Sequence, residues 1–222
     1  MQRHDLVTLH PGSPFRFACA AEDPVLQAAV GDWIGRGRPL VAARQAPDRN
    51  EILLGLTLPL SHKRQRVGCI VDADAVASVQ APLRLGQCLH RLPAATAVPL
   101  AILEREIGRC GAALGVFGSL AWEVISGEDY RQPTSDVDVI CDIATRYQFD
   151  ASLAALHQAA CVLDQRLDGE LRFPDGNAVA WREIHDHRHD PAALVLAKGA
   201  VDVGLLPLGR LLATLIEERR RA

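Results

Sequence analysis

The spacing of hydrophobic positions predicts a first half made of short elements. Apolar residues recur at helical intervals over residues 24–34, directly after Asp23, which can cap the first turn, and with Pro24 at the first helical position. Alternating patterns and apolar runs elsewhere in this half predict strands at 4–10, 39–43, 51–58 and 66–70, and the start of a short helix at 74–79. We expect these elements to form a small mixed domain.

The second half is predicted to hold longer, alternating elements. We place a domain boundary near residues 93–99 and expect domains at 1–95 and 96–222. Beyond it, the pattern predicts helices at 100–110, 119–126, 147–160 and 208–219, and strands at 112–117 and 135–141. The turn Pro174-Asp175-Gly176 predicts a hairpin, and the strands expected there and beyond are 161–173 with 177–181 and 194–198 with 200–205. Because helices and strands alternate, the fold class is α+β, or mixed α/β.

Composition narrows the class of protein. Hydrophobic residues make up 49% of the 222 residues and aromatic residues 5%, so we expect a core of aliphatic side chains. The formal net charge of -3 argues against a protein that coats nucleic acid, which would carry a basic surface. The six cysteines form no C-x-x-C pair, which favours reduced thiols in the cytoplasm. No signal peptide is recognisable and no stretch approaches the roughly 18 apolar residues of a membrane span, so we expect a soluble cytoplasmic protein.

Gly118 and Ser119 stand where a predicted strand ends and a predicted helix begins. Glycine lets the backbone approach a ligand closely, and a helix start offers unbonded N–H groups and the positive end of the helix dipole. The pair can therefore bind a phosphate. The alternative is an ordinary strand-to-helix turn in which Ser119 caps the helix.

Asp136 and Asp138 lie two positions apart on the strand predicted at 135–141. Because side chains alternate along a strand, both carboxylates would share one face while their valine neighbours point into the core. Carboxylates at this spacing repel each other unless a cation lies between them. Mg²⁺ binds through one or two carboxylates and takes phosphate oxygens as further ligands, so we expect a magnesium site here. The alternative is an edge strand with a solvated acidic face.

A phosphate-binding turn followed by a carboxylate pair on the next strand makes a complete phosphoryl-transfer site. The segment 115–142 resembles the polymerase-beta-like nucleotidyltransferases, whose signature is Gly-Gly or Gly-Ser, a gap, and two aspartates separated by one hydrophobic residue. The resemblance implies that this core forms the C-terminal half. The gap between Ser119 and Asp136 is somewhat longer than is common in that superfamily, and a polar, loop-like insertion at 127–134 accounts for it.

A second set of segments extends over nearly the whole chain: Arg3-His-Asp-Leu-Val, Gly37-Arg-Pro-Leu-Val, Gly118-Ser-Leu-Ala-Trp122, Pro133-Thr-Ser-Asp136, Arg166-Leu-Asp-Gly-Glu-Leu171, Phe173-Pro-Asp-Gly176 and Ala178-Val-Ala-Trp-Arg-Glu183. Together they resemble the phosphoribosyl-dephospho-CoA transferase of bacterial malonate decarboxylase, the holo-acyl-carrier-protein synthase of that system. The resemblance implies that a serine hydroxyl of the acyl carrier protein attacks the α-phosphorus of 2′-(5″-triphosphoribosyl)-3′-dephospho-CoA, and that pyrophosphate leaves. The implied partners are this donor and the carrier subunit, with neither nucleic acid nor membrane.

Further site residues are expected outside the motif. A third carboxylate usually completes sites of this superfamily, and Asp168 or Glu170 would supply it, with Glu183 next in order; a solvated hairpin is the alternative. Cations that could neutralise the donor phosphates are Arg36, Arg38, Arg44, Lys63, Arg64, Arg66 and Lys198, and solvated loops are their alternative.

Other features favour no special chemistry. His185, His187 and His189 precede Pro191 and suit an exposed turn better than a metal site, since no second cluster completes them. Trp122 and Trp181 are expected in the core. Three other functions stay open: a nucleotidyltransferase of the same fold with another acceptor, for example by adenylylation, a non-catalytic nucleotide-binding module, and a protein that only binds the carrier.

Overall fold

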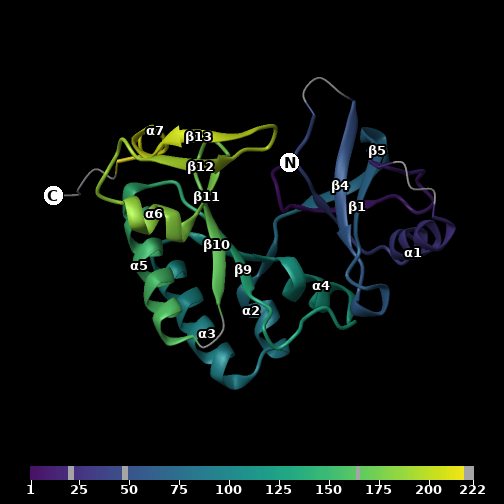
Figure 1. The fold of residues 1–222 in the computed structure, drawn as a ribbon, viewed down its shortest axis with the longest axis horizontal. Coiled ribbons are helices and arrows are strands. Elements are labelled where there is room, and N and C mark those ends of the chain that lie inside the picture. The colour runs from purple at the N-terminus through teal and green to yellow at the C-terminus, as the bar shows by residue number, and fades with distance from the viewer. Residues whose placement is uncertain (20–22, 47–49, 164–165, 218–222) are drawn as a thin grey trace.

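The computed structural model describes residues 1–19, 23–46, 50–163 and 166–217, which form two β-sheets with helices packed against them (Figure 1). The first sheet has the strand order β2-β5-β4-β3-β1-β6, and neighbouring strands are antiparallel. Its strands are β1 (Leu6–Leu9), β2 (Arg16–Phe17), β3 (Leu40–Ala42), β4 (Glu51–Thr57), β5 (Arg66–Asp72) and β6 (Val76–Gln80).

Helix α1 (Pro24–Gly35) covers this sheet and begins at the predicted residue. The Asp23 carboxylate accepts hydrogen bonds from the backbone N–H groups of Val25 and Leu26, which otherwise have no partner within the helix. Two 3₁₀ turns, η1 (Leu60–His62) and η2 (Ala73–Ala75), connect the later strands. The buried side chains of α1 and of the sheet form one hydrophobic cluster, the N-terminal core.

The second sheet has the strand order β13-β12-β11-β10-β9-β8-β7. Its strands are β7 (Leu83–Arg84), β8 (Ala113–Phe117), β9 (Val137–Asp142), β10 (Leu167–Arg172), β11 (Ala178–Ala180), β12 (Leu194–Lys198) and β13 (Val203–Pro207). Its helices and 3₁₀ turn are α2 (Leu85–Cys88), η3 (Leu89–Arg91), α3 (Ala94–Arg109), α4 (Gly118–Ser126), α5 (Arg146–Val162), α6 (Trp181–His187) and α7 (Leu208–Leu212). The α+β class predicted from the sequence is confirmed.

Strands β9 and β10 are parallel, and the other neighbouring strands of this sheet are antiparallel. A parallel pair needs a crossover connection, which α5 supplies. The helix begins with a capping box, in which the Thr145 side chain accepts from Gln148 N and the Gln148 side chain accepts from Thr145 N. This connection brings the start of β10 beside the start of β9.

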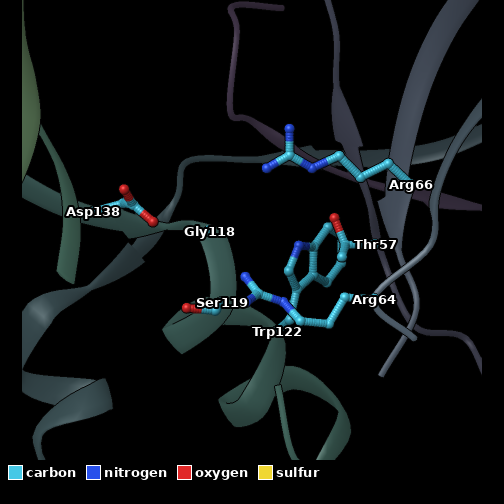
Figure 2. A pocket seen from close by; sticks show the side chains of 7 residues that line it. All are labelled: Thr57, Arg64, Arg66, Gly118, Ser119, Trp122 and Asp138. Carbon is cyan, nitrogen blue, oxygen red and sulfur yellow. The ribbon is translucent and has the colours of Figure 1, made fainter. Parts of the chain in front are cut away.

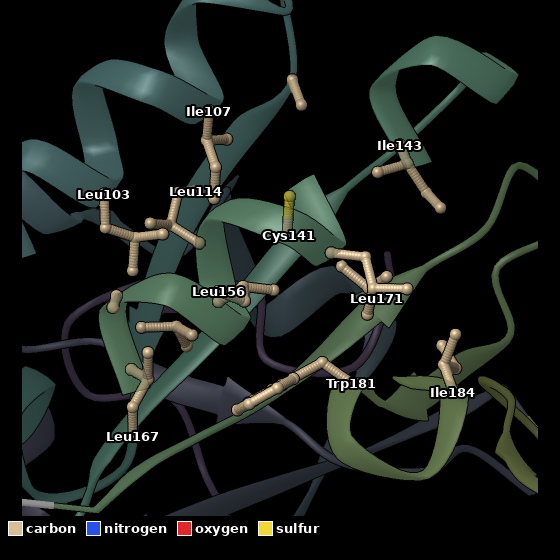
Figure 3. Packing of buried hydrophobic residues seen from close by; sticks show 14 of the residues in the cluster. Leu103, Ile107, Leu114, Cys141, Ile143, Leu156, Leu167, Leu171, Trp181 and Ile184 are labelled. Atoms are coloured by element: carbon tan, nitrogen blue, oxygen red, sulfur yellow. The ribbon is translucent and has the colours of Figure 1, made fainter. Parts of the chain in front are cut away.

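One face of the second sheet is buried and the other carries polar groups. Val139 and Cys141 of β9 belong to the C-terminal core, a cluster that includes side chains of α3 and α5 (Figure 3). Because side chains alternate along a strand, Asp138 and Ile140 lie on the opposite face. That second face is directed toward the N-terminal half, and it is where charged side chains collect.

Helix α4 belongs to both cores. Its Leu120 and Ala121 are in the C-terminal core, whereas Trp122 and the following Tyr130 are in the N-terminal core. The change from one sheet to the other falls between Gln80 and Leu83, ahead of the boundary expected at 93–99, so residues 83–95 pack with the C-terminal half. The two halves therefore meet around α4.

Several predicted elements were wrong in extent or type. Residues 74–79 form a 3₁₀ turn and β6 instead of a helix, because their valines pair with β1. Helix α3 begins at Ala94 and continues through Pro99. Helix α5 includes Cys161, which was assigned to a hairpin; residues 164–165 of that hairpin lie outside the described residues.

Two further corrections concern the end of the chain. The closing helix predicted at 208–219 ends at Leu212, and its last two residues lie outside the described part. His185 and His187 belong to helix α6 and not to a turn, because the residues from Trp181 onward cover the second sheet. No helix within the described ranges has both the length and the apolar character that crossing a membrane would need.

Gly169 is predicted to be required for the close packing of β10 on β9. A Cβ atom at this position would overlap the carbonyl oxygen of Val139, which is backbone and cannot move aside. We expect Gly169→Ala to lower the free energy of unfolding by about 1–3 kcal/mol, the usual cost of overpacking. Chemical denaturation followed by circular dichroism measures this loss.

The matched control is Gly55→Ala in β4. A Cβ atom there would lie 3.8 Å from the Val41 carbonyl oxygen, an ordinary contact, so little loss is expected. Equal unfolding midpoints for the two variants would contradict the steric argument.

Candidate functional site

A polar cavity of about 350 Å³ lies between the two halves of the protein. Figure 2 shows side chains from both halves around it. The N-terminal half contributes Thr57, Arg64 and Arg66, and the C-terminal half contributes Gly118, Ser119, Trp122 and Asp138. The cavity thus brings together the Gly-Ser turn and one aspartate of the sequence motif with a basic loop far away in the chain.

Gly118 is required by the geometry of the turn. Its φ of +71° is in the left-handed region, and a Cβ atom would overlap the Asp138 carboxylate, whose Cγ would lie 2.9 Å away. The backbone pairing of Phe117 with Asp138 across β8 and β9 creates this close approach. Glycine therefore allows the start of α4 and a carboxylate to share one side of the cavity.

The first turn of α4 is suited to an anion. Phe117 occupies the N-cap position and has no side-chain oxygen, so the first N–H groups of the helix lack the usual capping acceptor. Ser119, which the alternative interpretation placed at the cap, lies inside the helix and lines the cavity. Unbonded N–H groups, the helix dipole and a hydroxyl group together favour bound phosphate oxygens.

The carboxylates of the motif lie on adjoining strands. Asp138 is in β9 and is paired in register with Asp168 of the parallel strand β10, while Asp136 directly precedes β9. Burial and, after it, the charges of Asp168 and Asp136 raise the pKa of Asp138 to about 6, although Arg66 and Arg64 act in the opposite direction. A cation beside Asp138 would relieve this repulsion.

The described residues include no group of three or more His, Cys, Asp and Glu side chains that could hold a metal ion by themselves. Asp136 Oδ2 lies 3.8 Å from Arg166 Nη1, and one oxygen of Asp168 accepts a hydrogen bond from Gly169 N at 2.9 Å. Mg²⁺ commonly binds through one or two carboxylates and substrate phosphates. Asp138 with one acidic neighbour fits that mode of binding.

Of the two arginines of the cavity, Arg64 lies in the turn between β4 and β5, and Arg66 is the first residue of β5. Lys63 and Arg64 have positive φ values of 56° and 54°, and their backbone N–H groups bond to the carbonyls of Leu60 at 2.9 Å and Pro59 at 3.1 Å. Leu60 N in turn donates to Asp129 O, in the loop after α4, at 2.9 Å. The turn is therefore connected to the C-terminal half by a backbone hydrogen bond, on the side where Arg64 and Arg66 line the cavity.

The structure does not bring Arg36 and Arg38 to this cavity. Arg36 pairs with Asp32 at 2.9 Å on the exposed side of α1. Arg38 pairs with Glu128 at 2.9 Å, donates to Ser126 O and lies over the ring of Trp33. Arg38 thus connects α1 to the end of α4, a structural contact between the halves.

Glu170, Lys198 and the N-terminal segment form a separate buried charge cluster. Lys198 Nζ lies 2.8 Å from Glu170 Oε1, and Arg3 Nη1 lies 3.2 Å from Glu170 Oε2. Burial alone would raise the pKa of Glu170, but hydrogen bonds from His4 and Lys198 and the charge of Arg3 outweigh it and hold that pKa well below the usual range.

The structure separates the two candidates for a third carboxylate. Glu170 is paired with Arg3 and Lys198, whereas Asp168 lies next to Asp138 on the adjoining strand. Glu183 accepts a hydrogen bond from Leu196 N at 2.9 Å.

His4 connects this cluster to the cavity. Its ring stacks on Phe117, with ring centres 3.9 Å apart, and Phe117 directly precedes Gly118. Burial lowers the pKa of His4, which favours the neutral form of the ring. No local sequence pattern indicates this contact, because the two positions are more than a hundred residues apart. Trp122 and Thr57 were likewise not expected in the site.

Comparison with protein families identifies two adjoining domains. The family model described as Phosphoribosyl-dephospho-CoA transferase MdcG N-terminal domain matches residues 2–82, and the corresponding C-terminal domain matches residues 83–208. The junction coincides with the change of sheet between β6 and β7.

Curated relatives give the same result. A phosphoribosyl-dephospho-CoA transferase of Xanthomonas axonopodis pv. citri is 34% identical over 209 residues, which cover 92% of this chain and 93% of the relative. A phosphoribosyl-dephospho-CoA transferase of Bradyrhizobium diazoefficiens is 34% identical over 184 residues, which cover 82% of this chain and 81% of the relative. One of Pseudomonas fluorescens is 29% identical over 178 residues, which cover 79% of this chain and 81% of the relative. No solved structure matches the chain, so the polymerase-beta-like core stays a prediction.

We predict that Asp138→Asn stabilises the metal-free protein at neutral pH. The folded-state pKa of about 6 lies above the ordinary value of 3.8, so the folded protein binds more protons than the unfolded chain between these pH values. The contribution of Asp138 to wild-type stability therefore falls as pH rises from about 4 to about 6 and then stays constant. At pH 8 the substitution should raise the free energy of unfolding by up to about 3 kcal/mol.

Thermal and chemical unfolding of chelator-treated protein at pH 8 and pH 4.5 measure the effect, and the gain should shrink at the lower pH. A variant that is equally destabilised at both pH values would show that the carboxylate supports the fold instead of straining it.

Proposed function

Because the chain belongs to the phosphoribosyl-dephospho-CoA transferase family, we propose that the cavity between its halves is where a phosphoribosyl-dephospho-CoA group passes from a triphosphate donor to an acyl carrier protein. Family membership makes the chain a transferase. The proposed donor is 2′-(5″-triphosphoribosyl)-3′-dephospho-CoA, and the proposed acceptor is a serine hydroxyl of the malonate decarboxylase carrier subunit.

The proposal rests on the presence of cations on one side of the cavity and a carboxylate on the other. Arg64, Arg66 and the first turn of α4 present positive charge and N–H donors, whereas Asp138 presents a carboxylate on the other side. A triphosphate requires positive charge and N–H donors around it. A carboxylate is required by a hydroxyl that must lose its proton, or by a cation that assists this loss. A cavity with cations alone would suit simple anion binding.

The proposed reaction is a displacement at phosphorus. The serine oxygen forms a bond to the α-phosphorus while the bond from that phosphorus to the bridging oxygen of pyrophosphate breaks. The serine proton passes to a carboxylate or to water, and pyrophosphate leaves with the electron pair of the broken bond. Arg64 and Arg66 would hold the terminal phosphates, and Ser119 with the helix N–H groups would orient the phosphate chain.

Asp138, with Asp136 or Asp168, would hold Mg²⁺ together with phosphate oxygens of the donor. When bound, the ion supplies positive charge that offsets the charge gathering on the phosphates. The protein's own contribution is to keep these carboxylates close together and partly buried, as the raised pKa of Asp138 reflects.

We predict that Asp138→Asn and Asp136→Asn each lower the rate of carrier modification at least about 100-fold, since metal-assisted charge neutralisation contributes several kcal/mol. Intact mass spectrometry of the carrier, after incubation with enzyme, Mg²⁺ and the triphosphoribosyl donor, gives the rate. Parallel incubation with ATP distinguishes this reaction from adenylylation.

Asp150→Asn is the matched control, because that aspartate is exposed on α5 and, among the described residues, pairs with Arg146 alone. It should keep the wild-type rate. Near wild-type transfer by Asp138→Asn would remove Asp138 from the reaction.

We predict that Arg64→Ala and Arg66→Ala raise the KM for the donor about 10- to 100-fold, because each loses a hydrogen bond between charged groups worth about 1.5–3 kcal/mol. Steady-state kinetics at varied donor concentration measure this. Lys63→Ala in the same turn is the control. This substitution removes the same charge as the arginine variants, but Lys63 does not line the cavity. If all three variants shift KM equally, the effect is one of net charge and not of position.

A further inference from the structure

Trp122 is buried and yet has a polar atom at the cavity. Only 5% of its surface is exposed, and the residue lines the cavity beside Ser119. Figure 2 shows the nitrogen edge of the indole turned toward the space between Gly118 and Arg66. Among the described residues this N–H has no hydrogen-bond partner, whereas the indole N–H of Trp33 donates to Pro39 O at 3.0 Å.

The Trp122 nitrogen is not among the fully buried polar atoms of the described residues that lack a partner, whereas the Trp181 nitrogen is. A fully buried donor without an acceptor costs free energy. In a closed core, such a donor lowers the stability of the fold, because no ligand can reach it. At Trp122 the donor instead faces a polar cavity that is large enough for phosphate groups. An indole N–H can only donate, so its complement is an acceptor such as an anionic oxygen.

The ring is held in place by aromatic neighbours from the N-terminal core. Trp33 packs edge-on with ring centres 5.5 Å apart at 75°, and Tyr130 stacks at 6.5 Å and 24°. These contacts fix the direction of the N–H before any ligand arrives. A fixed donor loses little entropy on binding, which distinguishes it from a flexible arginine.

The neighbours of this N–H define the kind of ligand. Arg64 and Arg66 add charged donors on the same side, and the Thr57 side chain adds a hydroxyl. Asp138 lies apart from them, beside Gly118. The reacting phosphorus has to lie near the carboxylate, so the donor-rich side is left for the two phosphates that leave.

We propose that Trp122, Thr57, Arg64 and Arg66 form the subsite for the leaving pyrophosphate, with the Trp122 Nε1–H donating directly to one of its oxygens. This inference rests on the proposed function for the identity of the anion. It assigns a binding role to a residue that otherwise serves as the contact between α4 and the N-terminal core.

The test is Trp122→Phe, which keeps an aromatic ring in the cluster and removes the N–H. Isothermal titration calorimetry with inorganic pyrophosphate and Mg²⁺ should show a dissociation constant about 5- to 30-fold higher than that of the wild type. Pyrophosphate should also become a weaker inhibitor of transfer by the same factor. Trp181→Phe is the control, because Trp181 is a buried tryptophan of the C-terminal core whose N–H has no hydrogen-bond partner in the described part of the chain. It should bind pyrophosphate as the wild type does.

A second variant protects the test against misfolding. If Trp122→Phe melts well below the wild type, Thr57→Val replaces it, since valine keeps the branched shape and removes only the hydroxyl; a dissociation constant raised about 3- to 10-fold is then expected. Unchanged pyrophosphate affinity in a folded Trp122→Phe, or in Thr57→Val where it stands in, would overturn the subsite.

The two levels of the proposal can be separated. Wild-type enzyme that modifies the carrier but does not bind pyrophosphate would overturn the subsite and leave the function intact. Pyrophosphate binding that depends on Trp122, without any transfer to the carrier, would support the anion subsite and overturn the function.

Discussion

The packing of helix α4 into two hydrophobic cores is the constraint on which the cavity depends. Leu120 and Ala121 are buried in the C-terminal core, while Trp122 is buried in the N-terminal core. Because the helix begins at Gly118, this double anchoring fixes both the direction of its first N–H groups and the side from which the β4–β5 turn approaches. Neither half alone contains the cations and the carboxylate together.

Buried charges give the halves a second connection. Arg3 of the N-terminal segment reaches Glu170, and its carbonyl accepts from Arg172, which also pairs with Asp142 at 2.8 Å. Charges removed from water are tolerated when each has partners, and losing one partner is costly. The cluster therefore favours one arrangement of the halves, and it lies beside His4 and the strand that leads into the Gly118-Ser119 turn.

Local features of the site were predictable from the sequence, and features that depend on tertiary contacts were not. The Gly-Ser turn and the aspartates are encoded by neighbouring residues, and the capping signal at Asp23 correctly located α1. The roles suggested for Arg36 and Lys198 depended on which loops converge, and both side chains pair with carboxylates elsewhere. Residues 74–79 became a strand because β1 offers a pairing partner. The position of Trp122 at the cavity depends in part on its contact with Trp33, more than 80 positions away, which no local pattern reports.

The ion pair between Arg3 and Glu170 joins positions separated by 167 residues, and the hydrogen bond from Arg3 to Lys198 O spans 195. On the ribosome, the first sheet can pair its strands long before β10 and β12 exist, since domains generally fold as units from the N-terminus. The charged face of the second sheet forms only when those late strands arrive, and contacts between distant residues form slowly. The N-terminal half of a growing chain can thus fold before the charge cluster of the second sheet is complete. A nascent chain stalled before residue 198 would contain Arg64 and Arg66 but would lack Lys198, the partner of Glu170 in that cluster.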